Sequence, residues 1–177
     1  FPGARLNWAQ HIMRNEKPGK TALLHCSETL PLTELDWSEL AANVRKLATQ
    51  LRALGIKPGD RVAAYLPNVP EAVTALIATA SIGAIWSSCS PDFGVQGVLD
   101  RFGQVAPKVL LGCDGYFYNG KTIDVLPRVA EIVEALPTLE RVIMIPYTQR
   151  SPDIRAIPRS VDVHALMAGY RPGIIEF

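Results

Sequence analysis

The centre of the chain alternates between short apolar runs and segments in which apolar residues recur every three or four positions. Three runs, at 62–66, 84–89 and 108–112, are apolar rather than alternating, which is typical of strands buried on both faces. Between them, positions 69–80 and 95–102 show the period of an amphipathic helix. The order strand, helix, strand, helix, strand predicts crossover units that build a parallel sheet.

Local signals mark the ends of these predicted helices. Asn68 offers an N-cap oxygen to the first helix, Pro70 suits its first turn, and Gly83 ends it. Asp92 is the candidate cap of the second helix, and Asp124 is the candidate cap of a later one. These positions predict where each helix begins or stops.

The flanking segments add further elements of the same class. Residues 22–26 and 34–37 predict a β-hairpin, and residues 126–136 and 141–145 predict another helix and another parallel strand. A leucine-rich stripe between Leu40 and Leu54 predicts a long helix that packs on the sheet, with a partner-binding surface as the alternative. The fold class is therefore α/β, a mainly parallel sheet flanked by helices, with a small N-terminal β-hairpin.

The predicted elements divide the chain into three parts. Residues 1–20 form a lead-in segment, residues 21–147 the α/β subdomain, and residues 148–177 a linker rich in proline and arginine with only a short helix near 161–167. The chain starts at Phe1 rather than a methionine. We expect it to be a piece of a longer protein.

Composition narrows the possible functions. The net charge is +1, with acidic and basic residues interspersed, so we expect neither a nucleic acid nor a membrane surface as partner. The three cysteines are odd in number and show no C-x-x-C spacing, and the three histidines lack partners at metal-ligand spacing. We therefore expect a cytoplasmic protein without a disulfide framework or a metal site of its own.

One motif suggests nucleotide binding. The stretch Gly115–Thr122 matches the pattern G-x-x-x-x-G-K-[ST] of a phosphate-binding P-loop. Three aromatic rings at 116–118 and the helix-breaking Pro127 argue against that interpretation. A free-standing nucleotide-binding α/β module that uses this stretch stays an alternative. The other interpretation is an aromatic and basic ledge at a strand end, where Lys121 meets a phosphate and a tyrosine stacks on a base.

Several segments share a familiar pattern: FPGARLN at 1–7, WSEL at 37–40, GDRVA at 59–63, LPNVPE at 66–71 and GAIWSSCSPDF at 83–93. They resemble the acyl-CoA synthetases of the adenylate-forming superfamily. The run from Ser90 to Lys121 resembles the acetoacetate-activating branch of that family in particular. The resemblance implies an ATP-dependent acid–thiol ligase that forms an acyl-adenylate and then transfers the acyl group to CoA.

The resemblance also implies what this chain holds and lacks. It corresponds to the first subdomain of a much longer family protein, whose substrates are acetoacetate, ATP and CoA, with Mg²⁺ as cofactor. The family's phosphate loop and catalytic lysine have no counterpart in these 177 residues. We therefore assign no catalytic residue, and we expect the fragment to be inactive and to bind none of these ligands tightly.

One set of binding residues carries over. A related branch of the family uses a loop of pattern G-V-R-x-G-R/K to contact the nucleotide end of CoA. Gly120 and Lys121 match the closing pair of that pattern, while Tyr118 stands where its first arginine would be. The resemblance thus implies CoA contacts by Lys121, Tyr118 and Gly120. Ser90, Pro91 and Asp92 match the strand-end loop near the family's CoA channel.

Overall fold

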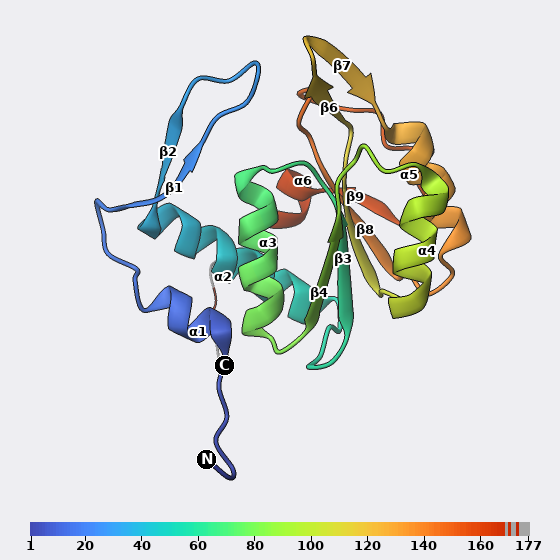
Figure 1. The fold of residues 1–177 in the computed structure, drawn as a ribbon. Coiled ribbons are helices and arrows are strands. Elements are labelled where there is room, and N and C mark those ends of the chain that lie inside the picture. Colours follow the sequence, from blue (N-terminus) through green and yellow to red (C-terminus); the bar gives the residue numbers. More distant parts are fainter. Residues whose placement is uncertain (169, 171–172, 174–177) are drawn as a thin grey trace.

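A five-stranded parallel sheet forms the centre of the computed structural model, which describes residues 1–168, 170 and 173 (Figure 1). The strand order is β4-β3-β5-β8-β9, and every neighbouring pair is parallel. The strands are β3 (Arg61–Tyr65), β4 (Ile85–Cys89), β5 (Val109–Cys113), β8 (Arg141–Ile145) and β9 (Ser160–Asp162). The predicted α/β class with a mainly parallel sheet is confirmed.

Helices cover both faces of this sheet. In Figure 1, α2 and α3 lie on one side of the strands, and α4 and α5 lie on the other. The helices are α1 (Trp8–Met13), α2 (Trp37–Ala53), α3 (Pro70–Ser81), α4 (Val95–Val105), α5 (Leu126–Ala135) and α6 (Val163–Met167). Within the described residues, no helix is both long and apolar enough to cross a membrane.

The apolar runs are buried as their pattern predicts. Strand β5 is buried at every position, and β3 and β8 are buried at all but their first residue. Strand β4 differs because it lies at the edge of the sheet, where Ile85 is 51% exposed. The leucine-rich stripe of α2 is buried in the core from Leu40 to Leu51, so the packing interpretation holds over the partner-binding one.

Two antiparallel hairpins project from the same end of the molecule in Figure 1. The first, β1 (Thr21–His25) with β2 (Thr33–Asp36), confirms the predicted N-terminal hairpin. The second, β6 (Gly115–Tyr118) with β7 (Lys121–Asp124), replaces the loop that we expected there. Its signal was present in the sequence, since Asn-Gly between residues of high strand propensity favours a two-residue hairpin turn.

The helix starts differ from the sequence predictions at all three candidate caps. The N-cap of α3 is Val69, not Asn68, because the residue before a proline is disfavoured in helical conformation and Val69 is extended. The N-cap of α4 is Gly94, not Asp92. The N-cap of α5 is Val125, not Asp124. The Asp124 carboxylate still accepts a hydrogen bond from the Leu126 amide, at 2.8 Å.

The proline- and arginine-rich segment was predicted as a linker with only a short helix, but it also contributes a strand to the sheet. Strand β9 pairs in parallel with β8 and extends the sheet by one strand. The predicted short helix is present as α6. A three-residue strand is too short for its periodicity to be visible in the sequence. Residues 169, 171–172 and 174–177 lie outside the described part of the chain.

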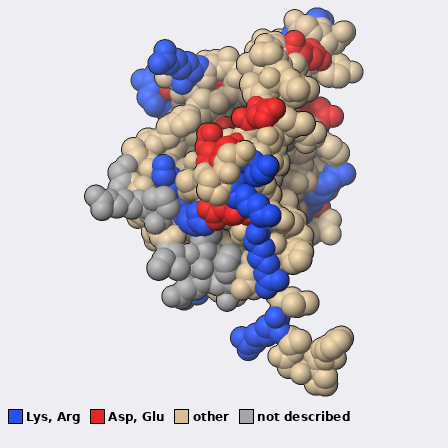
Figure 2. All heavy atoms as spheres, turned by 90° about the vertical axis from the view of Figure 1, so that its left-hand side faces the viewer, with Lys and Arg blue, Asp and Glu red and all other residues tan. Residues whose placement is uncertain are grey.

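Charged side chains are mixed on the surface. On the face shown in Figure 2, Lys and Arg side chains lie among Asp and Glu side chains rather than in one continuous patch of either sign. Ion pairs among the described residues join Arg45 with Glu16, and Lys108 with Asp60 at 2.9 Å.

Candidate functional site

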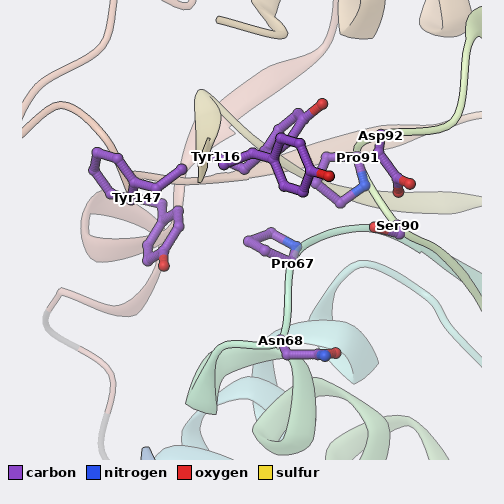
Figure 3. Close-up of a pocket in the computed structure, with 9 residues that line it drawn as sticks. Pro67, Asn68, Ser90, Pro91, Asp92, Tyr116 and Tyr147 are labelled. Carbon is purple, nitrogen blue, oxygen red and sulfur yellow. The ribbon is translucent and has the colours of Figure 1, made fainter. Parts of the chain in front are cut away.

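An open pocket of about 590 Å³ lies at the carboxyl ends of the parallel strands (Figure 3). Every wall follows a strand: Pro67 and Asn68 follow β3, the segment 90–92 follows β4, Tyr147 follows β8, and the aromatic residues 116–118 belong to the β6–β7 hairpin after β5. Counted along the chain, the five strands stand in the order 2-1-3-4-5. Such sheets bind ligands at the strand ends where the order reverses, between β3 and β5 here.

A buried tyrosine fixes one wall of the pocket. Tyr65, at the end of β3, is fully buried, and its hydroxyl lies 2.8 Å from the carbonyl oxygen of Pro91 and 2.6 Å from that of Phe93. The Arg128 guanidinium donates a further hydrogen bond to the Pro91 carbonyl at 3.3 Å. Burial raises the pKa of Tyr65, so its hydroxyl stays protonated and can donate. The segment between β4 and α4 is thereby held against the sheet.

A buried carboxylate fixes the opposite wall. Asp114 has no exposed surface, and its carboxylate accepts hydrogen bonds from the backbone N–H groups of Tyr147, Thr148 and Gln149 at 2.6–3.1 Å. It also accepts one from the Thr148 hydroxyl at 2.6 Å. The segment after β8 is therefore bound to the end of β5. Its Tyr147 ring meets Phe117 edge-on, with 5.3 Å between the ring centroids.

The β6–β7 hairpin carries the three residues that the family resemblance assigned to CoA. Tyr118 lines the pocket and is 66% exposed. Lys121 is its direct cross-strand partner, so both side chains project from the same face of the hairpin. Gly120 lies in the turn between them with φ +70°. The structure therefore brings Tyr118 and Lys121 together, while Gly120 contributes only backbone.

The P-loop interpretation does not fit this geometry. Lys121 and Thr122 belong to a strand, and α5 begins only at Leu126. In a P-loop, the Gly-Lys-Thr segment itself opens a helix whose dipole faces the phosphate. The nucleotide-binding alternative based on Gly115–Thr122 is therefore disfavoured.

The chemistry of the pocket suits binding rather than bond making. Its lining offers aromatic rings, prolines, polar side chains and one carboxylate, Asp92. The nearby thiol of Cys113 is no nucleophile, because burial raises its pKa to about 12. Nor does the described part of the chain gather three or more His, Cys, Asp or Glu side chains that could hold a metal ion.

Sequence reasoning singled out the hairpin and the Ser90–Asp92 segment but missed the groups that position them. Four positioning residues were missed: Tyr65, Asp114, Arg128 and Tyr147. Among them, only Asp114 carried a signal in the sequence, because it is an acidic residue that directly follows a fully apolar run. Because a buried charge requires partners, that position could have been marked as an anchor.

Comparison with known proteins identifies the family. The family model described as AMP-binding enzyme matches residues 10–164. The chain belongs to the AMP-binding enzyme family. The earlier resemblance to adenylate-forming enzymes is thus confirmed.

Relatives within the AMP-binding enzymes cover the whole chain. The acetoacetyl-coenzyme A synthetase of Rhizobium meliloti (strain 1021) is 47% identical over 180 residues, covering 100% of this chain and 27% of that protein. The acetoacetyl-CoA synthetase of Danio rerio is 42% identical over 176 residues, covering 98% and 26%. The solved acetoacetyl-CoA synthetase from Streptomyces lividans superposes with a TM-score of 0.88 at 48% identity, covering 97% and 26%. The chain thus spans about a quarter of the length of these AMP-binding enzymes.

Proposed function

We propose that this chain is part of an ATP-dependent acid–CoA ligase that forms acetoacetyl-CoA. The reaction converts ATP, acetoacetate and CoA into AMP, pyrophosphate and acetoacetyl-CoA through an acyl-adenylate. The observation that carries the proposal is the 47% identity to an acetoacetyl-CoA synthetase along the entire chain. A cytoplasmic location fits the three free cysteines.

Within that ligase, we assign the pocket to the nucleotide end of CoA. The exposed ring of Tyr118 offers a stacking surface for a base. The ammonium group of Lys121 projects from the same hairpin face and makes no hydrogen bond or ion pair within the part of the chain that the structure describes. It is therefore available to a phosphate as a point charge. Gly120 lets the turn between them close.

The remaining ligands are assigned to the complete enzyme rather than to this chain. No described cluster of carboxylates suits Mg²⁺, so we assign neither a metal contact nor a catalytic residue here. The isolated chain is expected to release no AMP above background when incubated with acetoacetate, Mg·ATP and CoA. A coupled AMP assay checks this, and acetoacetate-dependent release would contradict the view that the chain is catalytically incomplete.

The CoA assignment is tested by replacing Lys121 with alanine. Since CoA contacts are expected to be weak in the isolated chain, binding is followed by NMR chemical shifts during a CoA titration. Lys121→Ala is expected to weaken CoA binding about five- to tenfold, because one exposed charge-assisted contact to phosphate is lost.

The matched control is Lys17→Ala. Lys17 is also exposed but lies in the turn before β1, outside both hairpins. This variant removes the same charge and is expected to bind CoA like the unmodified chain. Equal weakening in both variants would show a general charge effect and would remove Lys121 from the proposed site.

A further inference from the structure

A carboxylate in one hairpin accepts hydrogen bonds from the turn of the other. Glu28 lies in the loop between β1 and β2, and its two carboxylate oxygens accept hydrogen bonds from the backbone N–H groups of Asn119 and Gly120, each at 2.9 Å. These partners are 91 and 92 residues away along the chain. The contact therefore joins the two projecting hairpins directly.

The conformation of the turn explains why a carboxylate fits it. Asn119 and Gly120 both have positive φ angles, +50° and +70°, as a two-residue type I′ turn requires. Successive N–H groups in such a turn point to one side and form a small concave site for an anion. The backbone hydrogen bonds from Gly120, which has the larger effect, and from Asn119 lower the pKa of Glu28. The side chain is thus present as the anion that the turn accepts.

The position of the turn links this contact to the pocket. Asn119 and Gly120 separate Tyr118, which lines the pocket, from Lys121, its cross-strand partner. The first hairpin borders the same region, since Leu23, Leu24 and His25 line a neighbouring pocket of about 290 Å³ that shares Asn68 with the larger one. The Glu28 contact therefore lies at the tip of the same hairpin that lines the pocket.

We propose that Glu28 is a built-in competitor of the incoming ligand, a carboxylate latch that occupies the two turn N–H groups until a phosphate group of CoA displaces it. This inference rests on the proposed CoA function of the hairpin. Glu28 is exposed, and exposed contacts of this kind are weak enough to exchange. A phosphate carries more charge and more acceptor oxygens than a carboxylate. Displacement would also release this direct contact between the two hairpins.

The latch makes a quantitative prediction for Glu28→Gln. A glutamine presents an NH₂ group to one of the two N–H donors, so the two-point contact is lost. The apparent affinity of a ligand falls by the fraction of protein that is competent to bind it. We therefore expect Glu28→Gln to bind CoA about three- to tenfold more tightly than the unmodified chain. The control is Glu34→Gln on β2, whose carboxylate bonds to Thr21 instead and whose replacement changes the net charge equally.

The experiment uses the ¹⁵N-labelled chain, with the amide resonances of Asn119 and Gly120 as reporters. Before any ligand is added, Glu28→Gln is expected to move these two resonances upfield, while Glu34→Gln leaves them in place. CoA is then titrated into each form, and pyrophosphate serves as a second probe. Tighter binding of CoA in Glu28→Gln alone supports the latch.

The possible failures are distinguishable. If Glu28→Gln leaves the two amide resonances unmoved, or leaves CoA affinity unchanged or weaker, the latch is overturned. If the resonances move but CoA perturbs none of the forms, the proposed CoA function of the hairpin fails. Tighter pyrophosphate binding in Glu28→Gln would then still support the turn as an anion site that Glu28 occupies, and equal pyrophosphate binding would overturn it.

Discussion

Replacing Asp114 by asparagine is expected to lower the free energy of unfolding by about 3 kcal/mol. The carboxylate is fully buried and accepts hydrogen bonds from three backbone N–H groups and one hydroxyl. Asparagine retains one acceptor oxygen but turns an NH₂ group toward donors that have no other partner. Each buried donor left unpaired costs about 1–3 kcal/mol. Urea denaturation followed by circular dichroism measures the loss.

Asp124→Asn is the matched control for this prediction. Asp124 is exposed and accepts one hydrogen bond, from the Leu126 amide at the start of α5. Asparagine keeps an acceptor oxygen for this exposed bond, so the change is expected to stay within about 0.5 kcal/mol. An Asp114→Asn variant as stable as this control would show that the carboxylate does not hold the Tyr147–Gln149 segment.

Replacing Gly115 by alanine is expected to cost about 1–3 kcal/mol and to shift the β6–β7 hairpin. An added Cβ would lie 2.6 Å from the carbonyl oxygen of Ile123 and 2.8 Å from the hydroxyl of Thr148. The carbonyl is backbone of the paired strand, so it cannot move without distorting the hairpin. The same urea measurement gives the stability, and the Phe117 and Tyr147 ring resonances report the displacement.

Gly103→Ala is the control, because an added Cβ has open space there. Gly103 is exposed within α4, and an added Cβ would meet no atom within 4 Å. Alanine is favoured over glycine in a helix interior by up to about 1 kcal/mol, so this variant is expected to be more stable than the unmodified chain. If both replacements changed stability in the same direction, crowding at Gly115 would not be the cause.

Periodicity in the sequence was enough to predict the central sheet and its helices. The strands β3, β5 and β8 are buried on both faces, so their residues form continuous apolar runs that a short window of sequence is enough to show. Helix starts were less predictable. Val69 before Pro70 stays extended, so α3 begins at Pro70 although Asn68 offers a capping oxygen. The segment before α4 contacts the Tyr65 hydroxyl through the carbonyls of Pro91 and Phe93, and such contacts between distant residues leave no periodic signal.

The candidate site was also predicted only in part from the sequence. The Tyr118–Lys121 segment was found from its sequence pattern. Its hairpin shape was not predicted, although the Asn119–Gly120 pair signals such a turn. The groups that hold the site in place were not found. Asp114 reaches partners 33–35 residues away, and Glu28 reaches its partners across more than half of the chain. Long-range hydrogen bonds of this kind appear only once the topology is known.

The edge position of β4 has a consequence for how copies of this chain associate. Its outer backbone groups have no strand partner among the described residues, since β4 pairs only with β3. The strand Ile85–Cys89 contains no charged residue or proline, the features that usually protect an open edge against strand addition. At high concentration the edge is a template on which a second copy can continue the sheet. A lysine in place of the exposed Ile85 is expected to oppose this pairing, because it puts a charge on the open edge.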